Sequence, residues 1–347
     1  MNMYRMKYLP GFIFSLFMMM GMSSCETDLK LPDTGERKIV LLGELVADDS
    51  ICFRGGQSTP LKNGTKLNFD LLQDMKVTVD DKNGTAVTMS GKEDDHASWL
   101  STLVYAHANK IQPGKTYEVR AEHPSLATVK AEVPVPQPFA AVITDTTTVP
   151  FLGMPCVRFR IRISDLPTAG DFYAIEAVQQ QYIQQQYFLY NNQWFLLQDH
   201  FELYDSLQQA GVTVDEKMED TYSRSLLRLR FYTTDVMSEH LLNGNVNIPA
   251  NRLLLKDNSF NGGTHDAEIF ITRESIFSGG PGVGFNTIIQ VKSVSADYFR
   301  YLQAYEAYDP FSGSNMTTPS RIPGNITNGV GIIGGVYRHQ FRYTFFD

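Results

Sequence analysis

Short segments in which apolar and polar residues alternate recur along most of this 347-residue chain. Residues 157–164 read VRFRIRIS, and residues 225–233 repeat the same alternation. A period of two predicts strands with one buried face, whereas a helix would need apolar residues three and four positions apart. Turn signals such as Asn83-Gly84 and Pro113-Gly114 separate the segments. The pattern therefore predicts a mainly β fold.

The first group of predicted strands occupies residues 39–134. Residues 75–79 and 85–89 flank a loop that ends in Asn83-Gly84, which is a strong signal for a β-hairpin. The segment Pro-Gly-Lys-Thr-Tyr-Glu-Val at residues 113–119 resembles part of the immunoglobulin-like and transthyretin-like modules of exported proteins. Short strands at this spacing predict an N-terminal β-sandwich.

Three prolines at alternate positions, Pro134, Pro136 and Pro138, follow this region. Proline cannot occupy a central strand, so residues 135–149 are predicted to be a linker. Residues 150–347 are then expected to form a larger C-terminal β domain with one or two short helices. One helix is predicted over residues 295–308, where Ser295 is a candidate N-cap and tyrosines recur at helical spacing.

Two patterns in the second region allow a structural and a functional interpretation. Arg158, Arg160 and Arg162 share one strand face and would form either a stripe for an anionic ligand or the solvent face of a half-buried strand. Residues 324–335 contain five glycines and would form either a ligand-cradling loop or a tight loop that closes the sandwich. We expect the structural role in both cases.

The first 25 residues have the features of an export signal. Arg5 and Lys7 precede a nearly unbroken apolar run at residues 12–22, which is too short to span a membrane as a helix. The small residues Ser23 and Ser24 then lead to Cys25. We interpret residues 1–24 as a signal peptide, Cys25 as the lipidated first residue of the mature chain, and residues 25–38 as a polar tether.

Charge and composition narrow the classes of function. Without residues 1–24 the chain has 28 Lys and Arg against 38 Asp and Glu, and this acidic balance argues against nucleic-acid binding. Cys52 and Cys156 could form a disulfide or remain as two buried thiols. No HExxH pair, no G-x-S-x-G segment and no zinc-type cysteine pair is present. We therefore expect no enzyme activity, no cofactor and no metal.

One segment has the composition of a binding surface. Residues 182–204 contain eight aromatic residues in 23, against 12% for the chain, with glutamines and asparagines between them. Aromatic rings and planar amides are suited to glycans or peptides, although a long hairpin with inward-facing rings would have the same composition. The candidate contact residues are Tyr182, Tyr187, Tyr190, Asn191, Asn192 and Trp194.

The whole mature chain resembles a family of Bacteroidetes lipoproteins, domain of unknown function 4249. The resemblance is carried by the Asn-Ile-x-Asn-Gly-x-Gly-Ile segment at residues 325–332, the strand that begins at Lys38, and the Pro-Gly-Lys-Thr-Tyr element. It implies a lipid-anchored outer-membrane protein that serves a TonB-dependent receptor in nutrient uptake. Glu26 and Asp28, directly after Cys25, resemble the surface-export signal of such lipoproteins, and we expect display at the cell surface. The alternatives are a periplasmic-facing lipoprotein, a fimbrial or adhesin-like subunit, and a hydrolase whose site is assembled in space.

Overall fold

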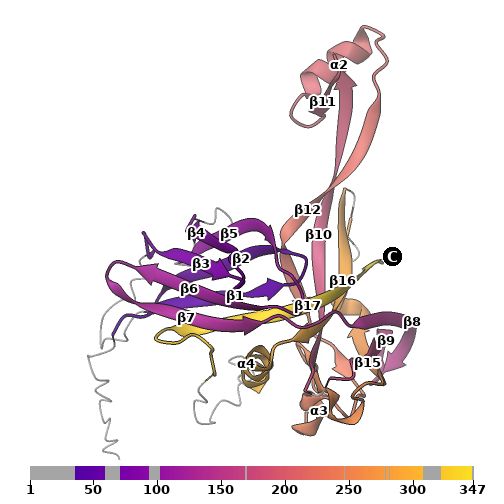
Figure 1. Ribbon diagram of the computed structural model, residues 1–347. Helices are drawn as coiled ribbons and strands as arrows, with labels where there is room; N and C mark the ends of the chain where they lie inside the picture. Colours follow the sequence, from indigo (N-terminus) through magenta and orange to yellow (C-terminus); the bar gives the residue numbers. More distant parts are fainter. Residues whose placement is uncertain are drawn as a thin grey trace, which may run out of the picture. The chain divides into compact units, whose positions relative to one another are not determined.

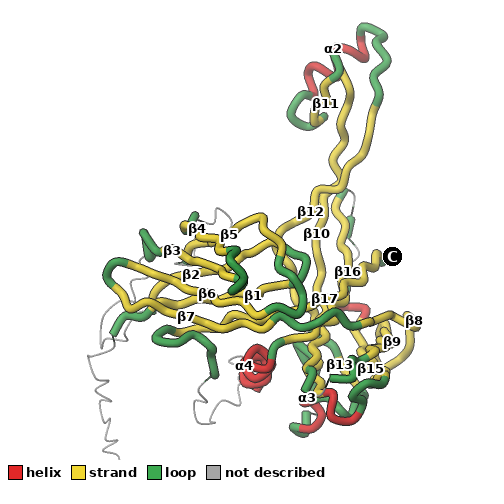
Figure 2. Tube along the Cα trace, viewed as in Figure 1, coloured by secondary structure: helices red, strands yellow, loops and turns green. Residues whose placement is uncertain are grey.

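The described strands form three β-sheets, and the prediction of a mainly β fold is confirmed (Figures 1 and 2). The computed structural model describes residues 36–58, 71–93, 102–168, 170–245, 247–277, 279–280, 282–307 and 322–345. The predicted signal peptide, Cys25 and most of the tether lie outside these residues. Among the described helices, none combines the length and the apolar character that crossing a membrane requires.

The largest sheet combines strands from the N-terminal, central and C-terminal parts of the described chain. Its strand order is β11-β10-β16-β17-β1-β2-β5, and β12 and β14 pair with the other edge of β10. The first and last described strands, β1 and β17, are parallel neighbours, with Val40 opposite Val330 and Val46 opposite Val336. The strands are β1 (Ile39–Val46), β2 (Ser50–Gln57), β5 (Leu103–Lys110), β10 (Phe172–Tyr190), β11 (Gln193–Leu196), β12 (Glu216–Leu229), β14 (Leu253–Lys256), β16 (Val283–Val294) and β17 (Val330–Thr344).

A four-stranded sheet packs with β1, β2 and β5 to form the N-terminal sandwich. Its order is β4 (Ala86–Ser90), β3 (Lys76–Asp80), β6 (Thr116–His123) and β7 (Leu126–Pro134). The expected hairpin is present, because β3 and β4 pair from Lys76 opposite Ser90 to Asp80 opposite Ala86. The inward-facing residues of these strands form one hydrophobic core, which β17 completes with Ile333.

A second four-stranded sheet covers the other half of the large sheet. Its order is β13 (Tyr232–Thr233), β15 (Thr264–Thr272), β9 (Met154–Ser164) and β8 (Ala140–Phe151). Apolar residues of β9 and β15 face those of β10, β16 and β17 in a separate core. The three arginines of β9 pair with carboxylates of the neighbouring strands: Arg158 with Asp145, Arg160 with Glu268, and Arg162 with Asp266. The arginine stripe is therefore neutralised within its own sheet.

Three short α-helices are described: α2 (Phe201–Gln209), α3 (Glu239–Leu242) and α4 (Ala296–Ala307). Helix α4 corresponds to the predicted helix, and it buries Tyr298, Phe299 and Leu302 in a third small core. Ser295 directly precedes α4, its carbonyl accepts from the Phe299 amide at 2.9 Å, and its Oγ accepts a hydrogen bond from the Gly335 amide at 3.2 Å. Two 3₁₀ turns, η2 (Asp257–Ser259) and η3 (Arg273–Ser275), follow β14 and β15.

The segment predicted as a linker is largely a strand. Residues 140–149 belong to β8, which pairs with β9, so this part is structured rather than a free connection. The hydrophobic cores do change here, since Val135 belongs to the first core and Phe139 to the second. The large sheet does not break, because β17 pairs with β1 on one side and with β16 on the other.

The glycine-rich segment is packed against the chain's own backbone. Gly331 has a φ of +116°, and a Cβ there would lie 2.0 Å from the Leu41 carbonyl oxygen. A Cβ on Gly335 would lie 1.9 Å from the Pro134 carbonyl oxygen. The Asn325 side chain donates to the Ile333 carbonyl at 2.9 Å and accepts from its amide at 3.0 Å. The segment therefore has the expected structural role, but residues 330–335 belong to strand β17 and pair with β1, so the expectation of a loop fails for its second half.

The two cysteines left after Cys25 differ in their surroundings. Cys52 lies in β2 and is exposed, so the expectation of two buried thiols fails for this residue. Cys156 lies in β9 and is buried, and burial raises the pKa of its thiol.

Candidate functional site

Strands β10 and β12 continue beyond the end of β16 as a two-stranded ribbon (Figure 1). The last β10–β16 pair is Ile183 opposite Val283, whereas β10 and β12 stay paired as far as Phe188 opposite Glu216. Strand β11 and helix α2 lie at the far end of the ribbon. We call residues 184–220 the arm. It contains five of the six residues that the sequence singled out, and Tyr182 lies at its base.

A two-residue turn built from Asn191 and Asn192 joins β10 to β11. Both residues are exposed and adopt left-handed conformations, with φ of +49° and +60°, and Tyr190 pairs with Gln193 across them. This is the backbone of a type I′ hairpin turn, which asparagine tolerates better than other non-glycine residues. The two asparagines therefore have a clear conformational role.

The end of the arm has its own small hydrophobic cluster. The Phe188 ring is fully buried, stacks on Phe195 at a centroid distance of 5.6 Å, and meets Tyr204 of α2 edge-on at 5.3 Å. Leu207 of α2 is also buried. None of these four residues belongs to the cores of the three sheets. The arm thus holds its terminal helix by local packing.

Other aromatic residues of the arm remain accessible. Trp194 is 40% exposed, and the Lys217 ammonium lies 4.3 Å from its ring centroid and 5.5 Å from that of Tyr187. Tyr187 and Tyr190 are half-buried. The sequence pattern thus contains both kinds of ring, and the strand alternation separates them: Phe188 points to the cluster and its neighbour Tyr187 to the opposite face.

Tyr182 fixes the base of the arm. Its ring lies over Gly284 of β16, where a Cβ would come within 2.1 Å of the ring, and it contacts Tyr222 of β12 at 5.7 Å. The Arg342 guanidinium in turn lies 4.8 Å from the Tyr222 ring centroid. The contacts of Tyr182 are thus with the body, and we assign it a packing role.

A shallow hollow of about 250 Å³ lies on the arm between β10, the end of β11 and α2. Gln184, Gln186 and Gln198 line it, together with Leu196 and Phe201. Phe201 is 61% exposed. Amides and an exposed ring can hydrogen-bond and stack on a polar ligand. Sequence reasoning included Phe201 and Gln198 in the aromatic and amide segment but did not select them.

Two further groups in the body have the residue types of active sites. His265 Nε2 lies 2.6 Å from Asp235 Oδ2, but the nearby Ser238 hydroxyl donates to the Asp235 carbonyl and accepts from the Leu241 amide at the start of α3. This arrangement caps a helix and does not present a nucleophile.

The second group brings the carboxylates of Asp165, Asp171 and Asp257 within 4.8 Å of one another. Such oxygens suit a hard cation. Asp257 accepts from the Gly170 and Asp171 amides, and Asp165 accepts from the Tyr173 hydroxyl. Burial raises the pKa of Asp171. These hydrogen bonds hold the loop that precedes β10, and we therefore assign the cluster a structural role.

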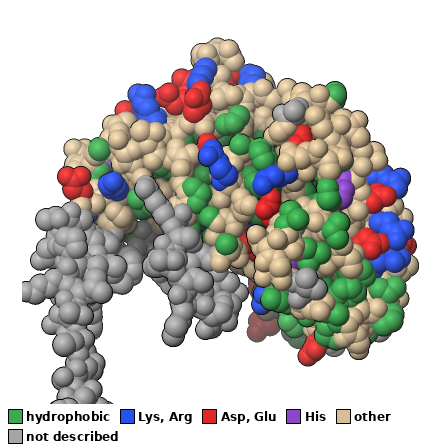
Figure 3. Space-filling model, turned by 90° about the horizontal axis from the view of Figure 1, so that it is seen from below, with side chains coloured by type: hydrophobic (Ala, Val, Ile, Leu, Met, Phe, Trp, Pro, Cys, Tyr) green, Lys and Arg blue, Asp and Glu red, His purple; other side chains and the backbone are tan. Residues whose placement is uncertain are grey.

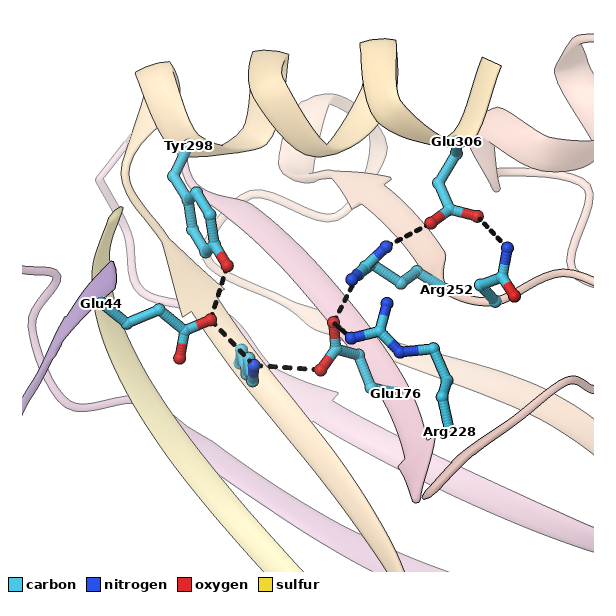
Figure 4. A network of polar contacts seen from close by, with 8 residues as sticks. Glu44, Glu176, Arg228, Arg252, Tyr298 and Glu306 are labelled. Carbon is cyan, nitrogen blue, oxygen red and sulfur yellow. Dashed lines mark hydrogen bonds and ion pairs between the residues drawn. The ribbon is translucent and has the colours of Figure 1, made fainter. Parts of the chain in front are cut away.

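A buried ionic network holds β10 below the arm (Figure 4). Lys292 of β16 lies between Glu176 of β10 and Glu44 of β1, and Tyr298 of α4 donates to Glu44 at 2.6 Å. Arg252 joins Glu176 to Glu306 of α4.

The charges of this network stabilise one another despite their burial. Burial opposes ionisation of Glu176, but Lys292 and Arg252 outweigh it and hold the pKa of that carboxyl below its usual range. Burial also opposes protonation of Lys292, yet the carboxylates of Glu44 and Glu176 raise its pKa. The arm therefore starts from a strand that is fixed to three neighbouring elements.

Comparison with known proteins identifies a family and little else. A family model described as a domain of unknown function, DUF4249, matches residues 26–342. None of the curated proteins matches the sequence. Among solved structures, a crystal structure of a mutant Salmonella alpha-2-macroglobulin is similar at 11% identity and a TM-score of 0.21, and the match covers 91% of this chain and 15% of that one.

Proposed function

This chain belongs to the DUF4249 family, and we propose that it is an outer-membrane lipoprotein that serves as a non-catalytic accessory or ligand-capture component of a TonB-dependent receptor system, with the arm as its contact element. The observation that carries the proposal is the arm itself. It extends past the end of β16, is packed by its own cluster, and exposes large apolar side chains.

The exposed residues of the arm are of the kinds found at protein interfaces. Trp194, Phe201 and Met218 are 40%, 61% and 58% exposed. Aromatic residues and methionine are enriched in interface cores, and large exposed apolar residues that cluster on one element commonly mark a contact site. The hollow beside Phe201 adds amides that could hold a glycan or a peptide.

The membrane attachment rests on Cys25. One acyl chain gives only marginal binding, and additional chains make the attachment stable. The 12 residues between Cys25 and Lys38 could extend to roughly 40 Å, which leaves the body free to reach an integral membrane partner. In this arrangement Cys25→Ala should release the protein from the membrane or leave it as precursor.

Removal of the arm tests the proposal directly. Ile183 and Thr221 are opposite each other in the β10–β12 pair, so residues 184–220 can be replaced by Asn-Gly to give a short hairpin. We expect the lipidated variant to keep its thermal melting temperature and its membrane fractionation, and to lose co-purification with a TonB-dependent receptor encoded next to it.

A second variant, Trp194→Ala in the intact arm, tests one contact residue. It should weaken the association by about 1–3 kcal/mol if this ring is a hot spot. Unchanged co-purification of the arm-deleted protein with the receptor would refute the role of the arm. Assembly of the native protein into fibres, without any receptor, would favour the fimbrial alternative.

A further inference from the structure

The arm has a high net negative charge for its length. Residues 184–220 contain seven acidic residues and one lysine, which gives 1 − 7 = −6, against −8 for all 347 residues. The acidic residues are Asp199, Glu202, Asp205, Asp215, Glu216, Glu219 and Asp220, and all seven are exposed.

Six of these seven carboxylates have no cationic partner among the described residues. Lys217 forms an ion pair with Glu219 at 2.7 Å. Glu216 accepts instead from the Gln186 amide and the Tyr204 hydroxyl, and Asp205 accepts from the Gln209 amide.

The body is different, because its surface carboxylates commonly lie beside Lys or Arg. The arginine stripe of β9 is one example, and on the face shown in Figure 3 blue and red side chains lie next to each other in several places. The unbalanced charge is therefore a property of the arm and not of the surface in general.

Carboxylates of the arm that have no cationic partner lie beside the exposed apolar side chains. In α2, Phe201 and Asp205 are four residues apart and share a helix face. In β12, Met218 lies between Glu216 and Asp220 on the same strand face. An apolar centre with a charged rim is the usual anatomy of a protein interface.

We propose that the arm docks on a protein surface that is basic and has an apolar recess, so that Phe201 and Met218 enter the recess and the arm's carboxylates meet Lys or Arg side chains around it. This inference rests on the proposed role of the arm as the contact element. The arm is poorly suited to a divalent cation, because among the described residues no three of its carboxylates lie close enough to share one ion. Like charges also repel an anionic lipid surface.

Charge complementarity of this kind acts mainly on the rate of association and on its dependence on salt. The test therefore places a photo-cross-linking amino acid at Phe201 or Met218 of the full-length chain in its native cells. Matched controls carry it at Val142 or Leu152 of the body, which are each 48% exposed. Mass spectrometry then identifies the peptide that is attached to the arm.

We expect the arm positions to cross-link to a segment with net positive charge, the yield to fall at least tenfold between 0.05 M and 0.5 M salt, and the body positions to give no such product. Neutralising Asp199→Asn, Glu202→Gln and Asp205→Asn together should reduce the yield at least tenfold at low salt. The matched triple variant Glu118→Gln, Glu122→Gln and Glu132→Gln in the body should leave it unchanged.

Each outcome separates this inference from the proposed function. A basic segment of a protein other than a TonB-dependent receptor would support the inference and refute the receptor assignment. Cross-linking to a neutral or acidic segment of the receptor would refute the inference and leave the receptor role standing. So would a cross-linking yield to the receptor that changes neither with salt nor in the arm triple variant. Absence of cross-links from both arm positions would refute the arm as the contact element, and the inference with it.

Discussion

Lys292 and Glu176, on the adjacent strands β16 and β10, form an ion pair at 3.0 Å in which both side chains are at least 94% buried. The same ammonium lies 3.1 Å from Glu44 of β1. The charges of Lys292 and Glu176 are therefore buried together, and the carboxylate of Glu44 contacts the same ammonium. Such a group is costly to assemble and costly to break, because removal of one member leaves the others uncompensated.

Lys292→Met should lower the free energy of unfolding by about 3–5 kcal/mol, because it leaves the carboxylates of Glu44 and Glu176 without their shared cation. Urea unfolding at neutral pH measures the change. The control is Lys82→Met, since Lys82 and Glu132 form an exposed pair whose loss should cost less than about 1 kcal/mol. Equal changes in the free energy of unfolding for the two substitutions would show that the buried network stabilises the fold no more than an exposed ion pair does.

Acidification should weaken the fold through Glu176. Its pKa is held below the ordinary value of 4.5, so the unfolded chain binds more protons than the folded chain in this range. The contribution is present above pH 4.5 and is lost as pH falls through the folded pKa. Urea midpoints between pH 7 and pH 3 should fall, and Glu176→Gln should be less stable at pH 7 but show a shallower acid slope. A slope identical to that of the native protein would contradict this assignment.

Tyr105 should make the fold sensitive to alkali. Its hydroxyl is buried without a hydrogen-bond partner among the described residues, and burial raises its pKa to about 12. The unfolded tyrosine ionises near pH 10, so the contribution of Tyr105 to stability is constant below pH 10 and falls as pH rises toward 12. Tyr105→Phe should reduce that fall and gain about 1 kcal/mol at neutral pH, because an unsatisfied polar group is removed. Thermal melts at pH 7 and pH 11 test both effects.

Gly335→Ala should strongly destabilise the packing of β17, because its Cβ would lie 1.9 Å from the Pro134 carbonyl oxygen and the neighbour is backbone. We expect a loss of about 3 kcal/mol, at the upper end of overpacking costs. Gly280→Ala is the control, since a Cβ there has no atom within 4 Å. Differential scanning calorimetry should show a lower melting temperature for the first variant alone.

Within the arm, Phe188→Ala and Trp194→Ala should separate packing from exposure. Truncation of the buried Phe188 ring should cost about 3–5 kcal/mol locally and speed hydrogen exchange across residues 184–220. Truncation of Trp194, which is 40% exposed, should leave exchange nearly unchanged. Faster exchange in Trp194→Ala than in Phe188→Ala would reverse our assignment of the two rings.

Elements whose pattern lies within a few neighbouring residues could be predicted from the sequence. The β3–β4 hairpin follows from Asn83-Gly84, and strand β9 follows from its alternation of arginines and apolar residues. A structural role for residues 324–335 was also expected, because glycines permit close approach of two backbones, but residues 330–335 form part of β17 and not a loop. The aromatic and amide composition likewise located five arm residues.

Pairing between distant segments was beyond sequence reasoning. Nothing in residues 39–46 indicates that their partner lies near residue 330, because any apolar strand would fit equally well. For the same reason the change from one core to the next was taken as a linker, although β8 pairs with β9 there. The carboxylates of the arm were visible, but their lack of cationic partners depends on the positions of side chains.

The parallel pairing of β1 with β17 also has a kinetic consequence. A chain emerges from a ribosome or a translocation pore with its N-terminal end first, so β1 can pair early with β2 but must wait until residues 330–336 have emerged before it can pair with β17. Contacts between residues nearly 300 positions apart slow folding, since the intervening loop has to close before the pairing gains any energy. Until then β1 exposes an apolar edge that other chains could pair with. We therefore expect refolding from urea to be slow and to yield less native protein at high concentration.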